Sequence, residues 1–77
     1  MSLAGEKLIE AATEILAESG MHAVTVSDVC RRAGYSRQTA YVHFGNVATL
    51  KKEAARYARK TNNERAITWL DMSGWEG

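Results

Sequence analysis

The three-residue segment GYS at 34–36 separates two short helical patterns, and this spacing restricts the fold of the chain more than any other feature. The first pattern, residues 26–33, follows Thr25, and the second, residues 37–43, follows Ser36. Threonine and serine are both residue types that cap the beginning of a helix. Two short helices joined by three residues that include glycine are typical of a helix-turn-helix. The sequence therefore predicts an all-α fold, a small helical bundle built around this motif.

Apolar residues at three- and four-residue spacing predict further helices on both sides of the motif. We expect one helix over 5–19, which Gly20 can end, and another over 47–60, which Asn46 can cap. Residues 65–72 could add a further short helix. The residues expected to share one core are Leu8, Ala12, Ile15, Leu16, Val26, Val29, Cys30, Ala40, Phe44 and Leu50.

The formal net charge is only +1, but the charged residues are unevenly distributed along the chain. Residues 1–29 and 61–77 carry net charges of −4 and −2, whereas residues 30–60 carry +7. A basic block between acidic flanks is typical of a surface that faces a polyanion, although solvated helix faces would give the same count. The basic residues of this block are Arg31, Arg32, Arg37, Lys51, Lys52, Arg56, Arg59 and Lys60.

Composition argues against several other classes of protein. No apolar run approaches the roughly 20 residues of a membrane span, and no signal peptide is visible, so we expect a cytoplasmic protein without a membrane partner. The lone Cys30 excludes an internal disulfide framework, and its place on the buried side of a helix makes it a poor nucleophile. A metal site at His22, Cys30 and His43 lacks the usual ligand spacing. We expect no metal, no cofactor and no enzyme activity.

The helix predicted over 37–43 offers few side chains to a core. On a helical wheel Ala40 and Phe44 point inward, whereas Gln38 and Val42 point almost directly away from them. A helix that buries so little needs another reason to be ordered, and binding to another molecule is such a reason.

Double-stranded DNA suits the remaining side chains of this helix. Arginine can pair with guanine through two hydrogen bonds, glutamine can do the same with adenine, and valine can contact the thymine methyl group. Threonine, tyrosine and histidine suit phosphate oxygens, which fix the register of a protein on the duplex. We therefore expect the helix to lie in the major groove. Its candidate contacts are Arg37, Gln38, Thr39, Tyr41, Val42 and His43.

The segment "AATEILAESGMHAVTVSDVCRRAGYSRQTAYVHFGNVATL" resembles the N-terminal DNA-binding domain of TetR-type transcriptional repressors. The resemblance covers about residues 5–55. It rests on an ordered combination: an apolar helix, a glycine, the run "TVSDVCRRAGYS" and the run "TAYVHF". It implies a sequence-specific regulator, a repressor that occupies operator DNA and obstructs polymerase.

The resemblance also implies roles for individual residues of the recognition helix. Thr39, Tyr41 and His43 would contact phosphates, and Tyr41 could also touch a base. Arg37 and Gln38 stand where the family reads bases or clamps the backbone.

Positions outside that helix complete the expected interface. The resemblance implies that Ser27 contacts a base or a phosphate. Lys51 and Lys52 belong to the basic block, and we expect them to face the DNA backbone. Val47 departs from the family pattern, which commonly has lysine there, and valine cannot contact a phosphate.

We expect residues 4–60 to form the DNA-binding domain and residues 61–77 a short tail. The tail would be the truncated start of the family's ligand-binding domain or a replacement for it. Because only about 17 residues follow Lys60, no small-molecule effector is expected in this chain, and a monomer or weak homodimer is expected. The alternative is a truncated or remnant module that acts through protein partners and binds no operator alone. The acidic first helix and Val47 favour this alternative.

Overall fold

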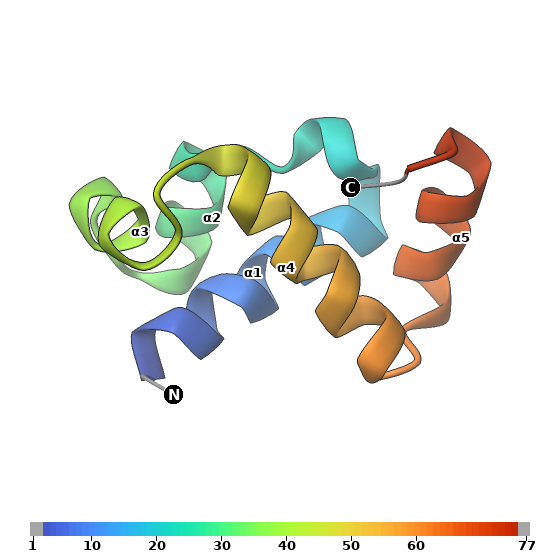
Figure 1. Ribbon diagram of the computed structural model, residues 1–77, viewed down its shortest axis with the longest axis horizontal. Helices are drawn as coiled ribbons and strands as arrows, with labels where there is room; N and C mark the ends of the chain where they lie inside the picture. The colour runs from blue at the N-terminus through green and yellow to red at the C-terminus, as the bar shows by residue number, and fades with distance from the viewer. Residues whose placement is uncertain (1–2, 76–77) are drawn as a thin grey trace.

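The computed structural model describes residues 3–75 as five α-helices and one short 3₁₀ helix (Figure 1). In chain order these are α1 (Leu3–Ser19), η1 (Met21–Ala23), α2 (Val26–Ala33), α3 (Arg37–Phe44), α4 (Val47–Lys60) and α5 (Glu64–Ser73). No strand occurs within residues 3–75, and the predicted all-α class is confirmed. Residues 76–77 of the expected tail lie outside the described part of the chain.

Helix α1 is the centre of the bundle, because it contacts every other helix. Helix α4 lies beside it, α2 and α3 pack at one end, and α5 packs at the other (Figure 1). The helix-turn-helix pair and α5 therefore occupy opposite ends of the long axis, and α1 and α4 connect them.

The core contains most of the residues predicted for it. Two of the expected residues, Val26 and Phe44, pack against this core but are only partly buried. Both lie near the end of a short helix, where solvent reaches one side of the side chain. The core also contains residues that were not predicted, many of them alanines: Ala11, Met21, Val24, Ala54, Ala55, Ala58, Ala66 and Leu70.

A buried hydroxyl group joins the two central helices. The Oγ1 of Thr13 donates to the carbonyl oxygen of Ile9 over 2.8 Å and lies 3.4 Å from the carbonyl oxygen of Ala54 on α4. Thr13 is 3% exposed, so this polar side chain is satisfied inside the core.

The helix boundaries agree closely with the expected ones, except at the first helix. Helix α1 begins at Leu3, two residues before the expected Gly5, and the 3₁₀ helix η1 was not predicted. Gly20 follows α1 with a φ of 94°, which side chains rarely adopt. A Cβ atom at Gly20 would also lie 2.9 Å from Cε3 of Trp69, so α5 packs directly on this glycine.

Four helices begin with a side chain that caps the main chain. The side-chain oxygens of Thr25, Ser36, Asn46 and Asn63 each accept a hydrogen bond from an N–H group three residues later, over 2.9–3.2 Å. Each bond satisfies one of the N–H groups that a helix leaves unpaired at its start. Caps recognised in the sequence thus set the starts of α2, α3 and α4.

Residues 61–75 pack on the same core as the rest of the chain. Ala66 and Leu70 of α5 are buried, and Trp75 is partly buried against the core. The Nε1 of Trp69 donates to the carbonyl oxygen of Ala17 over 3.2 Å. The segment expected to form a tail therefore closes one end of the bundle.

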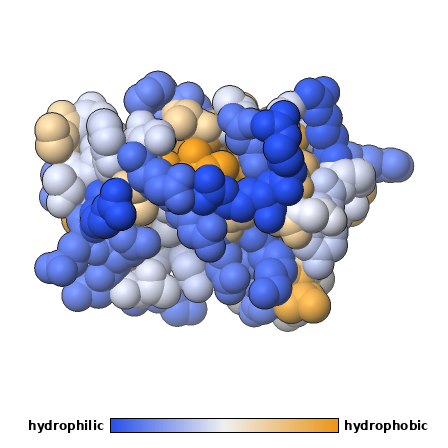
Figure 2. All heavy atoms as spheres, turned by 180° about the vertical axis from the view of Figure 1, so that it is seen from behind, coloured by the Kyte–Doolittle hydropathy of each residue, from blue (hydrophilic) through white to orange (hydrophobic). Residues whose placement is uncertain are grey.

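The face opposite the view of Figure 1 is mostly hydrophilic (Figure 2). A small hydrophobic area near its centre is surrounded by hydrophilic residues, so this face presents no broad apolar surface. Within the described residues, none of the helices has both the length and the apolar character needed to cross a membrane.

Candidate DNA interface

The turn between α2 and α3 is fixed by main-chain hydrogen bonds. Gly34 adopts a left-handed conformation with a φ of 82°, which ends α2. The carbonyl oxygen of Cys30 accepts hydrogen bonds from the N–H groups of Gly34, over 2.8 Å, and Tyr35, over 3.1 Å. These bonds set the direction in which α3 leaves α2.

Cys30 and Ser36 connect the end of α2 to the start of α3. The buried thiol of Cys30 lies 3.5 Å from the carbonyl oxygen of Ser36, to which it can donate. Burial raises the pKa of this thiol above its usual value, so Cys30 is a packing residue. The Oγ of Ser36 accepts from the main-chain N–H of Thr39 and lies 3.0 Å from its Oγ1. Thr39 is half-buried, and its hydroxyl lies next to the side chain that caps the helix.

Helix α3 is held on the bundle by one face and exposes the other. Ala40 is 3% exposed, and Phe44 is partly buried against the core. On the outer face, Val42 is 76% exposed and Tyr41 is 50% exposed. Gln38 and His43 are exposed as well, and the ring of His43 lies 6.1 Å from that of Phe44. The predicted outer face of the helix is therefore the exposed one.

Arg37 and Ser27 form a bridge between the two helices of the motif. The Nη2 of Arg37, the first residue of α3, donates a hydrogen bond to the Oγ of Ser27 on α2. The sequence assigned both residues to the same binding surface but gave no contact between them. The structure brings them together, and it leaves the guanidinium at the exposed edge of the motif.

The two lysines expected at the interface have different surroundings. Lys52 is exposed, whereas Lys51 is half-buried and lines a groove together with Met21 and Trp75. The two neighbouring lysines therefore differ in burial, and of the two only Lys51 lines this groove.

Ion pairs engage half of the basic block. Arg32 of α2 binds Glu18 of α1 through both guanidinium nitrogens, over 2.7 and 3.0 Å, and its Nη1 lies 3.4 Å from Glu14. The hydrogen bond from Arg32 lowers the pKa of Glu18 below its usual value. The other paired arginines, each with its partner, are Arg31 with Asp28, Arg56 with Glu53 and Arg59 with Asp71.

The net charge of the block did not reveal that half of its basic residues have acidic partners within the chain. Arg56 and Arg59 lie in the second half of α4, which runs away from α3 (Figure 1). The basic residues nearest to the helix-turn-helix and outside these ion pairs are Arg37, Lys51 and Lys52.

The start of α4 is a part of the candidate interface that the residue list from the sequence did not include. It follows α3 after Gly45 and Asn46, and its first residue, Val47, is 36% exposed. Thr49 is exposed in its first turn. The N–H groups at the start of a helix attract anions such as phosphate. In the sequence, Val47 was the residue that drew attention to this end of α4, because it departs from the family pattern there.

A capped, exposed helix projecting from a three-residue turn on a small helical bundle defines a helix-turn-helix domain. The chain matches the model of the bacterial regulatory proteins of the tetR family over residues 8–54, and it belongs to that family. A protein of Bacillus subtilis (strain 168), described as the uncharacterized HTH-type transcriptional regulator YvdT, is 34% identical over 41 residues. The match covers 53% of this chain and 21% of that protein, so the chain spans about a fifth of its length. No solved structure matches the chain significantly.

Family membership agrees with the resemblance seen in the sequence. It assigns the chain to the DNA-binding regulators of transcription and separates it from enzymes.

Proposed function

We propose that this chain is the operator-binding head of a TetR-type repressor, with α3 inserted in the major groove of double-stranded DNA. The observation that carries the proposal is the outer face of α3. That face exposes Gln38, Tyr41 and Val42, while the helix is capped by Ser36 and held by Ala40. The proposed DNA-binding unit spans residues 4–60.

Side chains along the centre of the outer face are assigned to the bases. Gln38 can pair with adenine through its amide, and the exposed Val42 can contact a thymine methyl group. Arg37 lies at the edge of the motif, where its guanidinium can reach a guanine or a phosphate. Ser27 holds that guanidinium in the free protein, because its hydroxyl accepts the hydrogen bond from Nη2.

Side chains on the flanks of α3 are assigned to the phosphates. Tyr41 and His43 are exposed, and Thr39 can turn its hydroxyl from Ser36 to a phosphate oxygen at little cost. Lys52 can add a charge contact, and the amides at the start of α4 can bind a further phosphate. Lys51 reaches the backbone only if its side chain leaves the groove that it lines.

Repression would follow from occupancy, because a protein bound at a promoter obstructs polymerase. Two heads on a palindromic operator would need half-sites about 34–36 Å apart, one helical turn of DNA. A single small module buries only roughly 600–1,000 Å² on DNA. We propose that this chain alone is a monomer or weak homodimer, and because one module buries so little area, we expect weak affinity for a single half-site.

Selection from a random duplex pool, followed by fluorescence anisotropy at two salt concentrations, tests the proposal. We expect an enriched motif, and we expect Gln38→Ala to relax preference at one base pair by about 1–3 kcal/mol. Thr68→Ala, on the exposed side of α5, is the matched control and should leave binding unchanged. If no duplex is bound at either salt concentration, the chain does not bind DNA by itself. The alternative function, a module that acts through protein partners, would then replace the proposed one.

A further inference from the structure

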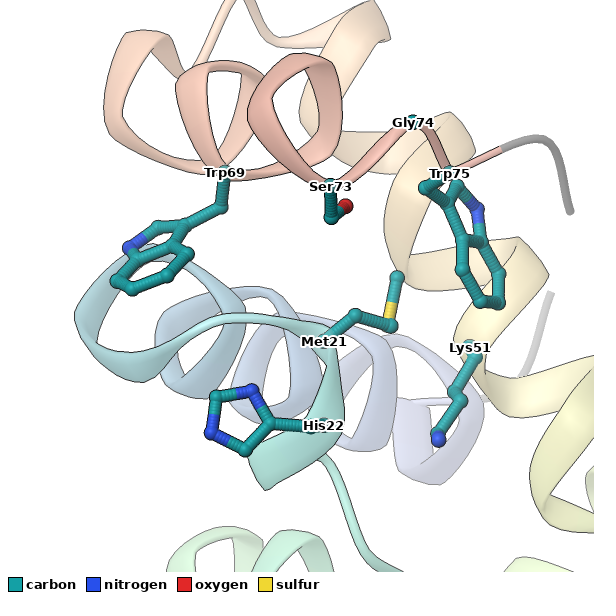
Figure 3. Close-up of a pocket in the computed structure, with 7 residues that line it drawn as sticks. All are labelled: Met21, His22, Lys51, Trp69, Ser73, Gly74 and Trp75. Atoms are coloured by element: carbon teal, nitrogen blue, oxygen red, sulfur yellow. The ribbon is translucent and has the colours of Figure 1, made fainter.

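A surface groove lies where η1, the first half of α4 and the end of α5 meet (Figure 3). Its volume is about 600 Å³. Met21 points into the middle, Trp69 and His22 lie on one side, and Trp75 and Lys51 lie on the other (Figure 3). Small-molecule sites typically have volumes of about 300–1,000 Å³, so this groove has room for a ligand of moderate size.

The lining of the groove is apolar and aromatic, with positive charge at its edge. Two indole rings and a thioether supply the apolar surface, and the ammonium group of Lys51 supplies the charge. None of the described residues that line the groove carries a carboxylate. Such a lining is complementary to a molecule that is flat, apolar and negatively charged.

We propose that this groove binds a small planar aromatic carboxylate. Its ring would lie on the indoles of Trp69 and Trp75, because aromatic rings attract one another in offset or edge-to-face arrangements. Its carboxylate would pair with the Nζ of Lys51 at the edge of the groove. This proposal departs from the expectation drawn from the sequence, which was that no effector binds this chain.

One wall of the groove is already held in place. The Nε1 of Trp69 donates to the carbonyl oxygen of Ala17, and its ring packs against Gly20. The ring therefore needs little ordering when a ligand arrives, which reduces the entropy cost of binding. Its hydrogen-bonding group is occupied, so Trp69 offers a ligand its apolar ring.

Lys51 gives the groove a connection to DNA, and this part of the inference rests on the proposed function. Lys51 lies one helical turn after Val47, the first residue of α4, at the end of that helix that follows α3. A carboxylate bound to its ammonium group would hold Lys51 in the groove and remove it from the phosphate backbone. The ligand would therefore weaken DNA binding.

Naphthalene-2-carboxylate and its neutral counterpart naphthalene-2-carboxamide are suitable probes. We expect the carboxylate to bind one site per chain in calorimetry, and to shift the indole N–H signals of Trp69 and Trp75 in two-dimensional NMR. The carboxamide should bind about two- to fivefold more weakly, the effect of one solvent-exposed ion pair. Both titrations are performed without DNA, so their outcome is independent of the proposed function.

Two variants identify the site, and the lysine variant has a matched control. Trp75→Ala should weaken binding of the carboxylate about tenfold. Lys51→Gln should abolish the preference for the carboxylate over the carboxamide, whereas Lys52→Gln, its exposed neighbour, should preserve it. Circular dichroism shows whether each variant is folded, and the comparison of the two lysine variants remains decisive if Trp75→Ala unfolds the chain.

Three results would overturn the proposal. The first is equal binding of the two probes, or no binding up to about 5 mM, where an affinity is too weak to be specific. The second is a set of shifts at α3 in place of the indole signals. The third is sedimentation that shows a dimer dissociated by Trp75→Ala, because a second copy would then occupy the groove. If the carboxylate binds the groove but leaves DNA affinity unchanged, only the connection through Lys51 fails.

Discussion

Trp69 and Ala17 are joined by a hydrogen bond of 3.2 Å from the indole Nε1 to the main-chain carbonyl oxygen, across 52 positions of sequence. The contact fixes α5 to the last turns of α1. It also places the indole ring on Gly20, where a Cβ atom would lie only 2.9 Å away.

Gly20→Ala should therefore destabilise the fold by about 1–3 kcal/mol, because it adds a clash with the ring to an unfavourable φ. Gly74→Ala is the matched control, since Gly74 also has a positive φ but a Cβ there would meet nothing within 4 Å. Urea unfolding followed by circular dichroism measures both. Equal losses in the two variants would show that Trp69 does not press on Gly20.

Ser27→Ala should weaken DNA binding through Arg37. The hydroxyl accepts a hydrogen bond from the guanidinium, and loss of this bond frees the arginine to adopt other rotamers. We expect a loss of about 0.5–1 kcal/mol in binding, with little change in unfolding free energy because both groups are at the surface. A double-mutant cycle with Arg37→Ala, measured by anisotropy, isolates the coupling. Strictly additive losses would mean that Ser27 acts on DNA independently.

Acid should weaken the contact between α1 and α2. The hydrogen bond from Arg32 lowers the pKa of Glu18 in the folded protein, so the ionised form is favoured by folding. Its contribution is present above the pKa of the unfolded chain, about 4.3, and is lost as the pH falls through the lower folded value. The melting temperature of the wild type should therefore fall more steeply below this pH than that of Glu18→Gln.

Glu6→Gln removes one carboxylate from the first turn of the same helix and serves as the control for this pH series. It should follow the wild-type pH dependence. Parallel curves for the wild type and Glu18→Gln would contradict the assignment.

Val47→Lys should strengthen binding to DNA. Val47 is the exposed first residue of α4, and a lysine there can reach a phosphate. Each phosphate neutralised contributes about −0.9 to the slope of log affinity against log salt. With roughly three to five phosphate contacts, the wild-type slope should lie at about −2.7 to −4.5, and the variant should be steeper by about one.

Met72→Lys adds the same charge on α5, at a side chain that is 77% exposed, and should change the slope little. Equal steepening in both variants would indicate a general charge effect. A response to Val47→Lys alone would place the start of α4 on the DNA backbone.

The helix-turn-helix could be predicted from sequence because its signals are local. Thr25, Ser36 and Asn46 cap helices by contacts within three residues, and Gly34 ends α2 through its own backbone conformation. The outer face of α3 follows from helical geometry alone.

The remaining features depend on contacts between distant segments. The pairing of Arg32 with Glu18, and of Trp69 with Ala17, is set by how the helices pack, which no local pattern records. The charge count of the basic block therefore did not show that Arg32 is paired with Glu18. A short helix over 65–72 could be predicted from its local pattern, but the packing of α5 on α1 through Trp69 could not.

The buried alanines of the central helices have a mechanical consequence. Alanine has no rotatable side-chain torsion, so burying it costs no side-chain entropy. Ala12 of α1, Ala54 and Ala58 of α4, and Ala66 of α5 are all fully buried. Side chains of this kind cannot change rotamer to absorb a displacement. At these positions, a displacement of α5 against α1 and α4 would therefore have to move helix backbones, because the side chains there have no rotamer to change.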